Sequence, residues 1–167
     1  MKVKNIQIHF EEYAEGEQLP SSDLALLTEA KQAVKNAYAP YSEFNVGAAV
    51  LLENGRVVKG SNQENASYPL GLCAERVAIF HANSAYPDLK ILAVAITAKA
   101  QNFVTQSPIT PCGACRQVMA ETENRQNQSI RIIMSGQEGV TQIIDGIENL
   151  LPLSFKEEKL KKKKKLS

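Results

Sequence analysis

The chain has 167 residues, of which 44% are hydrophobic and 22% charged, a composition typical of one folded domain. It contains no apolar run near the ~20 residues of a membrane-spanning helix, and its first residues lack the apolar segment of a signal peptide. Three cysteines are an odd number that does not suit a disulfide framework, so we expect a protein of the reducing cytoplasm.

The net charge of +1 hides an uneven distribution along the chain. Residues 156–167 carry seven Lys and two Glu, a local charge of +5, so the remaining 155 residues have a net charge of −4. Proteins that grip nucleic acid usually present a basic face. The mildly acidic body therefore argues against a polynucleotide partner and favours a small neutral substrate. The Lys-rich segment 156–167 is expected to be a disordered, solvated tail.

The N-terminal part of the chain predicts an extension followed by a helix. In the extension, residues 1–20, a short half-buried strand is expected where apolar side chains alternate with polar ones, and the stretch from 11 to 20 is expected to be a polar loop. A helix capped by Ser21 or Ser22 should run to about Tyr38, because Pro40 cannot continue it. The alternating strand residues are Ile6, Ile8 and Phe10, and the helix has one apolar face made of Leu24, Leu27, Val34 and Tyr38.

The rest of the chain alternates strands and helices. Asn54-Gly55 is a strong signal for a two-residue hairpin turn, and two helices should begin near Cys73 and Cys112. The order of elements predicts a three-layer α/β/α sandwich over residues 21–155, with a mixed five-stranded sheet and the two cysteine-bearing helices as crossovers between parallel strands. The five strands are expected at 46–52, 56–60, 91–97, 130–134 and 140–144.

All three cysteines lie in two short motifs, Cys73-Ala74-Glu75 and Pro111-Cys112-Gly113-Ala114-Cys115, each after a turn and at an expected helix start. Helix N-termini favour thiolates, and three thiolates can hold one zinc ion per subunit while leaving its fourth position open to water. Glu75 would stand beside that water and could move protons. Arg76 and Arg116 directly follow the motifs, and either could donate to a ligand sulfur and offset the negative charge.

The cysteines allow two other interpretations. Cys112-x-x-Cys115 alone could be a redox pair, but that leaves Cys73 unexplained. A closed structural zinc site needs a fourth ligand, for which only His9 and His81 are available. His81 lies eight residues beyond Cys73 on the same expected helix, about 12 Å away, which is too far to share an ion. His9 stays open, but the Cys-Ala-Glu motif favours a catalytic site.

The cysteine motifs, with Arg116-Gln117 after the second, resemble the cytidine deaminase family in its three-cysteine form, where Cys73 replaces the His of the wider zinc deaminase class. The stretches 41–49 and 62–66 resemble the family as closely, and the resemblance runs from about Tyr38 to Phe155. It implies zinc-dependent hydrolytic deamination of cytidine and 2′-deoxycytidine to uridine and 2′-deoxyuridine with release of ammonia, a reaction of pyrimidine salvage.

The resemblance also implies a mechanism and a set of base contacts. A water held on the zinc would attack C4 of the cytosine ring, and Glu75 would move its protons to N3 and to the departing amino group. The ring of Phe44 would pack on the base, although an ordinary core aromatic is the alternative. The backbone N–H of Ala74 would bind the pyrimidine O2, and the backbone carbonyl of Thr110 would bind the amino group.

The resemblance also implies how the ribose is bound and how subunits assemble. If Asn62 and Glu64 lie on an extended segment, their side chains point to one side and suit sugar hydroxyls, as the family implies; a solvated strand face is the alternative. The segment 150–155 resembles the family's C-terminal segment, in which the aromatic residue enters a neighbouring subunit's site. Phe155 therefore implies a homotetramer with sites at subunit interfaces.

Two further functions stay open on the sequence. One is a related deaminase that acts on another aminopyrimidine, such as blasticidin S, although Asn62 and Glu64 favour a ribose. The other is a non-catalytic zinc or redox domain. Metal analysis and an assay for released ammonia distinguish these functions from a nucleoside deaminase.

Overall fold

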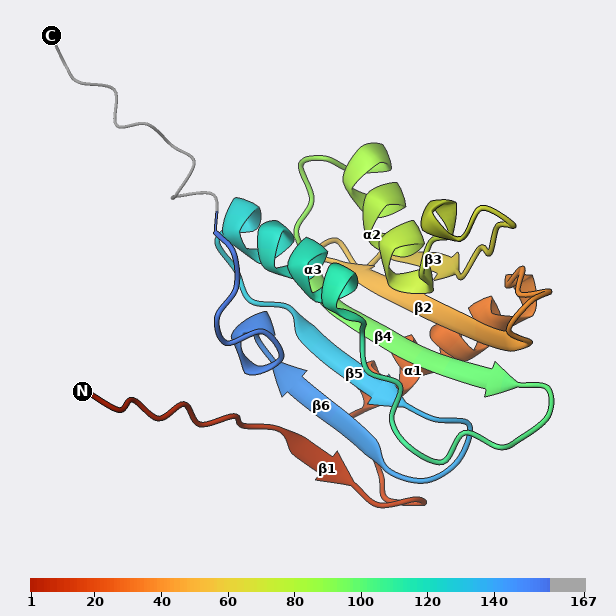
Figure 1. Ribbon diagram of the computed structural model, residues 1–167, viewed down its shortest axis with the longest axis horizontal. Helices are drawn as coiled ribbons and strands as arrows, with labels where there is room; N and C mark the ends of the chain where they lie inside the picture. The colour runs from red at the N-terminus through yellow and green to blue at the C-terminus, as the bar shows by residue number, and fades with distance from the viewer. Residues whose placement is uncertain (157–167) are drawn as a thin grey trace, which may run out of the picture.

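The computed structural model describes residues 1–156, and in that range a six-stranded mixed sheet is covered by helices on both faces. Helices α2 and α3 lie on one face and α1 lies on the other (Figure 1). The elements are β1 (Glu11–Tyr13), α1 (Ser21–Ala33), β2 (Phe44–Leu52), β3 (Val57–Ser61), α2 (Ala74–Ala85), β4 (Ile91–Ala100), α3 (Gly113–Gln126), β5 (Arg131–Ser135) and β6 (Thr141–Asp145), with short 3₁₀ turns at Val34–Asn36, Tyr68–Leu70 and Ile147–Asn149.

The strand order is β1-β6-β5-β4-β2-β3, and only β4 and β5 pair in parallel. Strands β3 and β4 also run in the same direction, because each pairs antiparallel with β2. The predicted α/β/α sandwich is therefore confirmed, with α2 connecting β3 to β4 and α3 connecting β4 to β5. Both helices begin beyond the carboxyl ends of these strands, which is where open α/β sheets bind their ligands.

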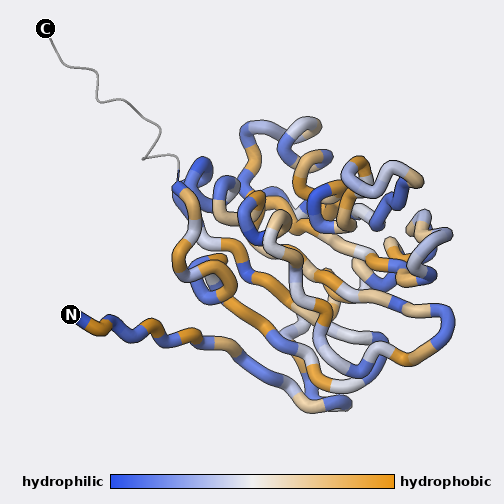
Figure 2. The backbone as a smooth tube through the Cα atoms, in the orientation of Figure 1, coloured by the Kyte–Doolittle hydropathy of each residue, from blue (hydrophilic) through white to orange (hydrophobic). Residues whose placement is uncertain are grey.

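The prediction of five strands was wrong by one, and the sixth strand lies in the N-terminal extension. Residues 11–13, expected in a loop, form β1, while the alternating stretch before them forms no strand and is exposed. That stretch is visible in Figure 2 as alternating hydrophobic and hydrophilic colour ahead of β1. The difference has a physical cause, because a distant side chain, Arg131, holds β1 against the sheet edge.

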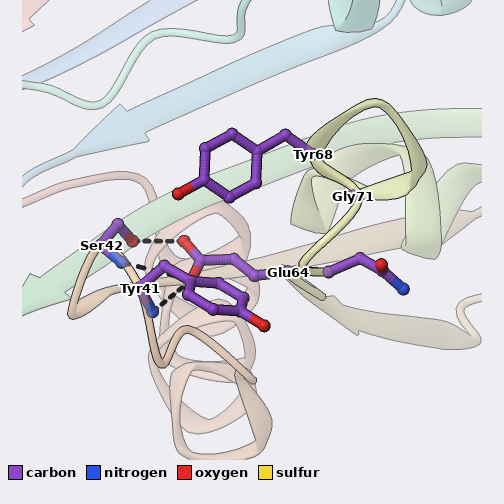
Figure 3. Close-up of a pocket in the computed structure, with 6 residues that line it drawn as sticks. Tyr41, Ser42, Glu64, Tyr68 and Gly71 are labelled. Carbon is purple, nitrogen blue, oxygen red and sulfur yellow. Dashed lines mark hydrogen bonds between the residues drawn. The ribbon is translucent and has the colours of Figure 1, made fainter.

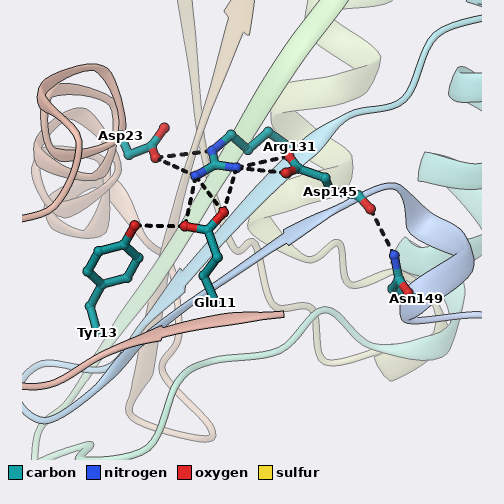
Figure 4. A network of polar contacts seen from close by, with 6 residues as sticks. All are labelled: Glu11, Tyr13, Asp23, Arg131, Asp145 and Asn149. Carbon is teal, nitrogen blue, oxygen red and sulfur yellow. Dashed lines mark hydrogen bonds and ion pairs between the residues drawn. The ribbon is translucent and has the colours of Figure 1, made fainter. Parts of the chain in front are cut away.

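Arg131 lies at the start of β5 and pairs with three carboxylates (Figure 4). Its guanidinium nitrogens lie 3.3 Å from Glu11, 3.0 Å from Asp23 and 2.8 Å from Asp145. These partners come from β1, α1 and β6, and Asp23 is buried. The Tyr13 hydroxyl also donates to Glu11 at 2.7 Å. These ion pairs join the polar strand β1 to the sheet and to α1. The position of β1 therefore could not be predicted from the alternation of apolar residues.

Two hydrophobic cores separate the layers. The larger core lies between the sheet and helices α2 and α3, and the smaller lies between the sheet and α1. The α1 helix ends at Ala33 rather than near Tyr38, and the predicted face is only partly correct because Leu24 and Tyr38 are exposed. The larger core includes Val50, Ile79, Val94, Ile96, Met119 and Ile132, and the smaller includes Leu26, Leu27, Ala30, Ala49 and Ile133.

Glycines in β2 and β3 allow helices to lie directly on the sheet. A Cβ at Gly60 would lie 2.5 Å from the carbonyl oxygen of Ala74 and from the amide nitrogen of Ala78, both in α2. A Cβ at Gly47 would clash in the same way with Ala30 of α1 on the opposite face. The first turn of α2 therefore rests on the backbone of β3. No helix within residues 1–156 is long and apolar enough to cross a membrane.

Candidate active site

The three cysteines meet where α2 and α3 begin. Cys73 and Cys112 are the N-cap residues of the two helices, and Cys115 lies in the first turn of α3, which confirms that each motif opens a helix. The Sγ atoms of Cys73 and Cys112 are 3.7 Å apart, and those of Cys112 and Cys115 are 3.5 Å apart. Tetrahedral zinc with Zn–S bonds of about 2.3 Å requires sulfurs about 3.8 Å apart. The cluster is therefore placed to hold a zinc ion.

The cluster has three protein ligands and one open side. Among residues 1–156 its ligand atoms come from the three cysteines, with neither His9 nor His81 contributing. Cys115 is buried, Cys73 is partly buried and Cys112 is exposed. Three thiolates with an open fourth position are the donor set of a catalytic zinc rather than of a closed structural site.

Hydrogen bonding polarises the cluster before any metal binds. A hydrogen bond from Cys115, together with one from Arg76, holds the pKa of the Cys73 thiol down, to about 5. Donation to Cys73 and burial raise the pKa of the Cys115 thiol above its ordinary value. The two shifts favour the thiolate at Cys73 over the thiolate at Cys115. A metal that takes all three sulfurs as thiolates would release the protons that the thiols still carry.

The two arginines differ in what they contact. The Arg76 Nη2 atom lies 3.9 Å from the Cys73 sulfur and 3.3 Å from the Gly71 carbonyl oxygen, so Arg76 can offset thiolate charge. Arg116 instead donates to two backbone carbonyls, those of Pro111 and Leu150, each at 2.8 Å. Arg116 therefore joins the turn before Cys112 to the C-terminal segment.

Glu75 lies in the first turn of α2, is 4% exposed, and lines the same cavity as Cys73 and Cys112. Burial raises the pKa of its carboxyl above the usual range. A carboxyl group whose pKa moves towards neutrality can both accept and donate a proton during one reaction cycle.

The cavity that opens onto the cluster has a volume of about 340 Å³. Phe44 and Asn62 line it on one side, and Thr110 lines it near Cys112. Ala74 is fully buried beside Glu75. Four of the six expected substrate-binding residues thus face the cavity: Phe44, Asn62, Glu64 and Thr110.

A second hollow of about 320 Å³ adjoins this cavity and shares Glu64, Tyr68 and Gly71 with it (Figure 3). Glu64 accepts hydrogen bonds from the backbone N–H groups of Tyr41 and Ser42, at 2.9 and 3.3 Å, and from the Ser42 hydroxyl. The Ser42 hydroxyl is the main cause of a pKa of Glu64 below its usual value. Sequence reasoning missed this support, because nothing in the spacing links residues 41–42 to Glu64.

Asn62 is also held by the backbone. Its Oδ1 atom accepts from the Val46 N–H at 2.8 Å, and its Nδ2 atom donates to the Phe44 carbonyl at 2.9 Å. A side-chain amide has two donor hydrogens and two acceptor lone pairs, so one of each is left for a ligand. Phe155 is 54% exposed, and its carbonyl accepts from Gln117 of α3 at 2.9 Å.

Comparison with known proteins identifies the family. A sequence model described as "Cytidine and deoxycytidylate deaminase zinc-binding region" matches residues 20–129. A cytidine deaminase of Halalkalibacterium halodurans is 52% identical over 96 residues, 58% of this chain and 68% of the relative. A cytidine deaminase of Sporosarcina psychrophila is 40% identical over 136 residues, 81% of this chain and 92% of the relative.

Solved structures agree with the sequence comparisons. A crystal structure of cytidine deaminase from Burkholderia pseudomallei superposes with a TM-score of 0.68 at 39% identity, covering 79% of this chain and 98% of that one. A cytidine deaminase from Mycobacterium tuberculosis gives a TM-score of 0.61 at 34% identity, covering 80% and 96%. The chain therefore belongs to the cytidine and deoxycytidylate deaminase family and is an enzyme of this type.

Proposed function

We propose that the protein hydrolyses the exocyclic amino group of cytidine and 2′-deoxycytidine, giving uridine, 2′-deoxyuridine and ammonia, as a step of pyrimidine salvage. One observation carries the proposal: a single cavity joins two zinc-ligating cysteines, the buried Glu75 and the polar pair Asn62 and Glu64. Relatives that span most of this chain are named cytidine deaminase, which supports the same substrate class. Residues 21–155 would form the deaminase domain.

The chemistry divides between the metal and Glu75. Zinc held by the three cysteines would lower the pKa of a water molecule towards neutrality. Glu75 accepts a proton from the water that attacks C4 and delivers it to ring N3. It then moves the second proton, from the new C4 hydroxyl to the amino nitrogen, so that the C4–N bond breaks and ammonia leaves. Burial of Glu75 suits both steps, because its raised pKa lets one group act as base and acid.

Backbone and side-chain groups would orient the nucleoside. The N–H of Ala74 belongs to the first turn of α2, where helix N–H groups have no intrahelical partner, so it can donate to the pyrimidine O2. The carbonyl of Thr110 would accept from the amino group, and the ring of Phe44 would pack on the base. The free amide positions of Asn62 and the carboxylate of Glu64 would bind the ribose. Neither contact requires a 2′-hydroxyl, so both nucleosides fit.

We also infer a homotetramer in which Phe155 enters a neighbouring subunit's cavity. Phe155 is half exposed, and the segment that carries it is held to α3 through Gln117 and Arg116. An aromatic side chain held on the surface suits contact with another subunit. A site built from reduced thiolates suits a cytoplasmic enzyme.

The test is a substrate panel. Purified, zinc-loaded protein is given cytidine, 2′-deoxycytidine, cytosine and blasticidin S, and amino-group loss is followed by ultraviolet absorbance and by released ammonia. Turnover of the two nucleosides well above that of cytosine is expected, because cytosine lacks the ribose that Asn62 and Glu64 would bind. Turnover of blasticidin S alone would replace the proposal with the related deaminase. Zinc binding without any ammonia release would replace it with a non-catalytic domain.

A further inference from the structure

The loop between β4 and α3 carries an aromatic side chain, Phe103, that pairs with a ring of the cavity wall. Phe103 is 61% exposed, and its ring stacks on Phe44 with ring centroids 6.3 Å apart and an interplanar angle of 25°. Aromatic pairs attract at centroid separations of about 4.5–7 Å. Phe44 is among the residues that line the cavity, whereas Phe103 is not. Phe103 therefore contacts a proposed substrate-binding ring without lining the cavity itself.

The loop is held by hydrogen bonds on both sides of Phe103. On one side, Asn102 donates to the carboxylate of Glu43, and the Gln101 N–H donates to the Glu43 carbonyl at 3.1 Å. On the other, the buried Thr105 donates its hydroxyl to the Ala98 carbonyl at 3.1 Å. The Thr105 carbonyl also accepts from the N–H of Gln137, at 2.8 Å. The stack on Phe44 is thus built on a fixed loop.

The backbone next to Phe44 gives a second, independent observation. Glu43 has φ of 54°, in the left-handed region that side chains other than glycine rarely adopt. Such a conformation persists only where surrounding contacts enforce it. Here the two contacts from residues 101 and 102 enforce it, one residue before the ring that lines the cavity. The same loop therefore sets the backbone before Phe44 and contacts its ring.

We propose that Phe103 is a positioning residue for substrate binding, acting through Phe44; the inference rests on the proposed function. With its ring paired to Phe103, the Phe44 side chain is restrained before the base arrives, and less rotamer freedom is lost on binding. The metal ligands and Glu75 lie at the starts of α2 and α3, on other elements than the stacked pair. Loss of Phe103 should therefore weaken nucleoside binding and leave the chemical step unchanged.

The test compares Phe103→Ala with Phe103→Tyr, which keeps a ring, and with Val104→Ala, which alters an exposed neighbour in the same loop. With zinc content matched, Phe103→Ala should raise KM for cytidine about three- to tenfold, the range given by the strength of aromatic pairs. Its kcat should stay within twofold of wild type, because the loss weakens binding of the substrate and of the transition state equally. Phe103→Tyr and Val104→Ala should keep both constants within twofold.

A double-mutant cycle shows whether the effect passes through Phe44. In a Phe44→Ala background, Phe103→Ala should add less than a twofold change in KM. An unchanged KM in Phe103→Ala, or the full increase in the Phe44→Ala background, would overturn the positioning role while leaving the proposed function intact. Absence of cytidine turnover by the zinc-loaded wild type would overturn the proposed function and this inference with it.

Discussion

Substitution of Gly60 by Ala should damage catalysis from outside the active site. Gly60 lies in β3 under the first turn of α2, the turn that carries Ala74 and Glu75 and follows Cys73. A Cβ there would lie 2.5 Å from Ala74 O and from Ala78 N, and ordinary contacts of this kind begin near 3.4 Å. The start of α2 must therefore move away from β3 by about 1 Å, a distance set by the lower limit of van der Waals contact.

That displacement has two calculable costs. Overpacking of this size costs about 1–3 kcal/mol of unfolding free energy, and for a chain of this length each kcal/mol lowers Tm by about 2–4 °C. A misplacement of about 1 Å at a reacting group can cost on the order of 10²-fold in rate. The kcat of zinc-loaded Gly60→Ala should therefore fall far more than its lower folded fraction explains, because Glu75 and the Ala74 N–H both move.

Gly47→Ala is the matched control, because its Cβ would meet α1 on the opposite face of the sheet. Both variants are assayed for Tm, bound zinc and kcat on cytidine. Gly47→Ala should lower Tm while the folded fraction keeps wild-type kcat. Equal kcat in the two variants after correction for folded fraction would refute the claim that close contact between β3 and α2 positions the catalytic turn.

Three further results are expected. Glu75→Gln should retain zinc and lose about 10²- to 10⁴-fold in kcat, the usual contribution of a general acid–base group, and wild-type turnover would exclude its proton-transfer role. Cys112→Ala should lose most of its zinc by metal analysis and melt at a lower temperature, because metal binding contributes to folding; full zinc occupancy would contradict the three-cysteine site. Arg131→Met should leave the buried Asp23 carboxylate without its ion pair and lower unfolding free energy by about 1–3 kcal/mol in urea titrations, with kcat unchanged. An unaltered midpoint of urea unfolding would show that the network of Figure 4 contributes nothing measurable to stability.

Local signals in the sequence predicted most of the sheet and the location of the metal cluster. The Asn54-Gly55 hairpin, the apolar run that became β4, and a cysteine at each helix start depend on neighbouring residues, and the structure agrees with all three. The resemblance to a family then predicted substrate contacts for residues whose side chains give no sign of such a role, such as Ala74.

The features that sequence reasoning missed depend on residues far apart in the chain. The position of β1 depends on Arg131, 120 residues from Glu11, and so the alternation at 6–10 predicted the strand too early. The position of Arg116 next to Cys115 suggested a hydrogen bond to a ligand sulfur. Arg116 donates instead to the carbonyl of Leu150, 34 residues away. The stack of Phe103 on Phe44 joins the loop before α3 to the start of β2 in the same way. Such contacts leave no periodicity or spacing in a single sequence.

The separation of the two cysteine motifs couples metal binding to the fold of the sheet. Cys73 and Cys112 are 39 residues apart, and the whole of β4 lies between them in the chain. A metal that bridges their sulfurs closes this loop, so its binding favours the arrangement in which β4 lies in the middle of the sheet. In a chain without bound metal this cross-link is missing, and the cysteines remain free thiols that can be oxidised.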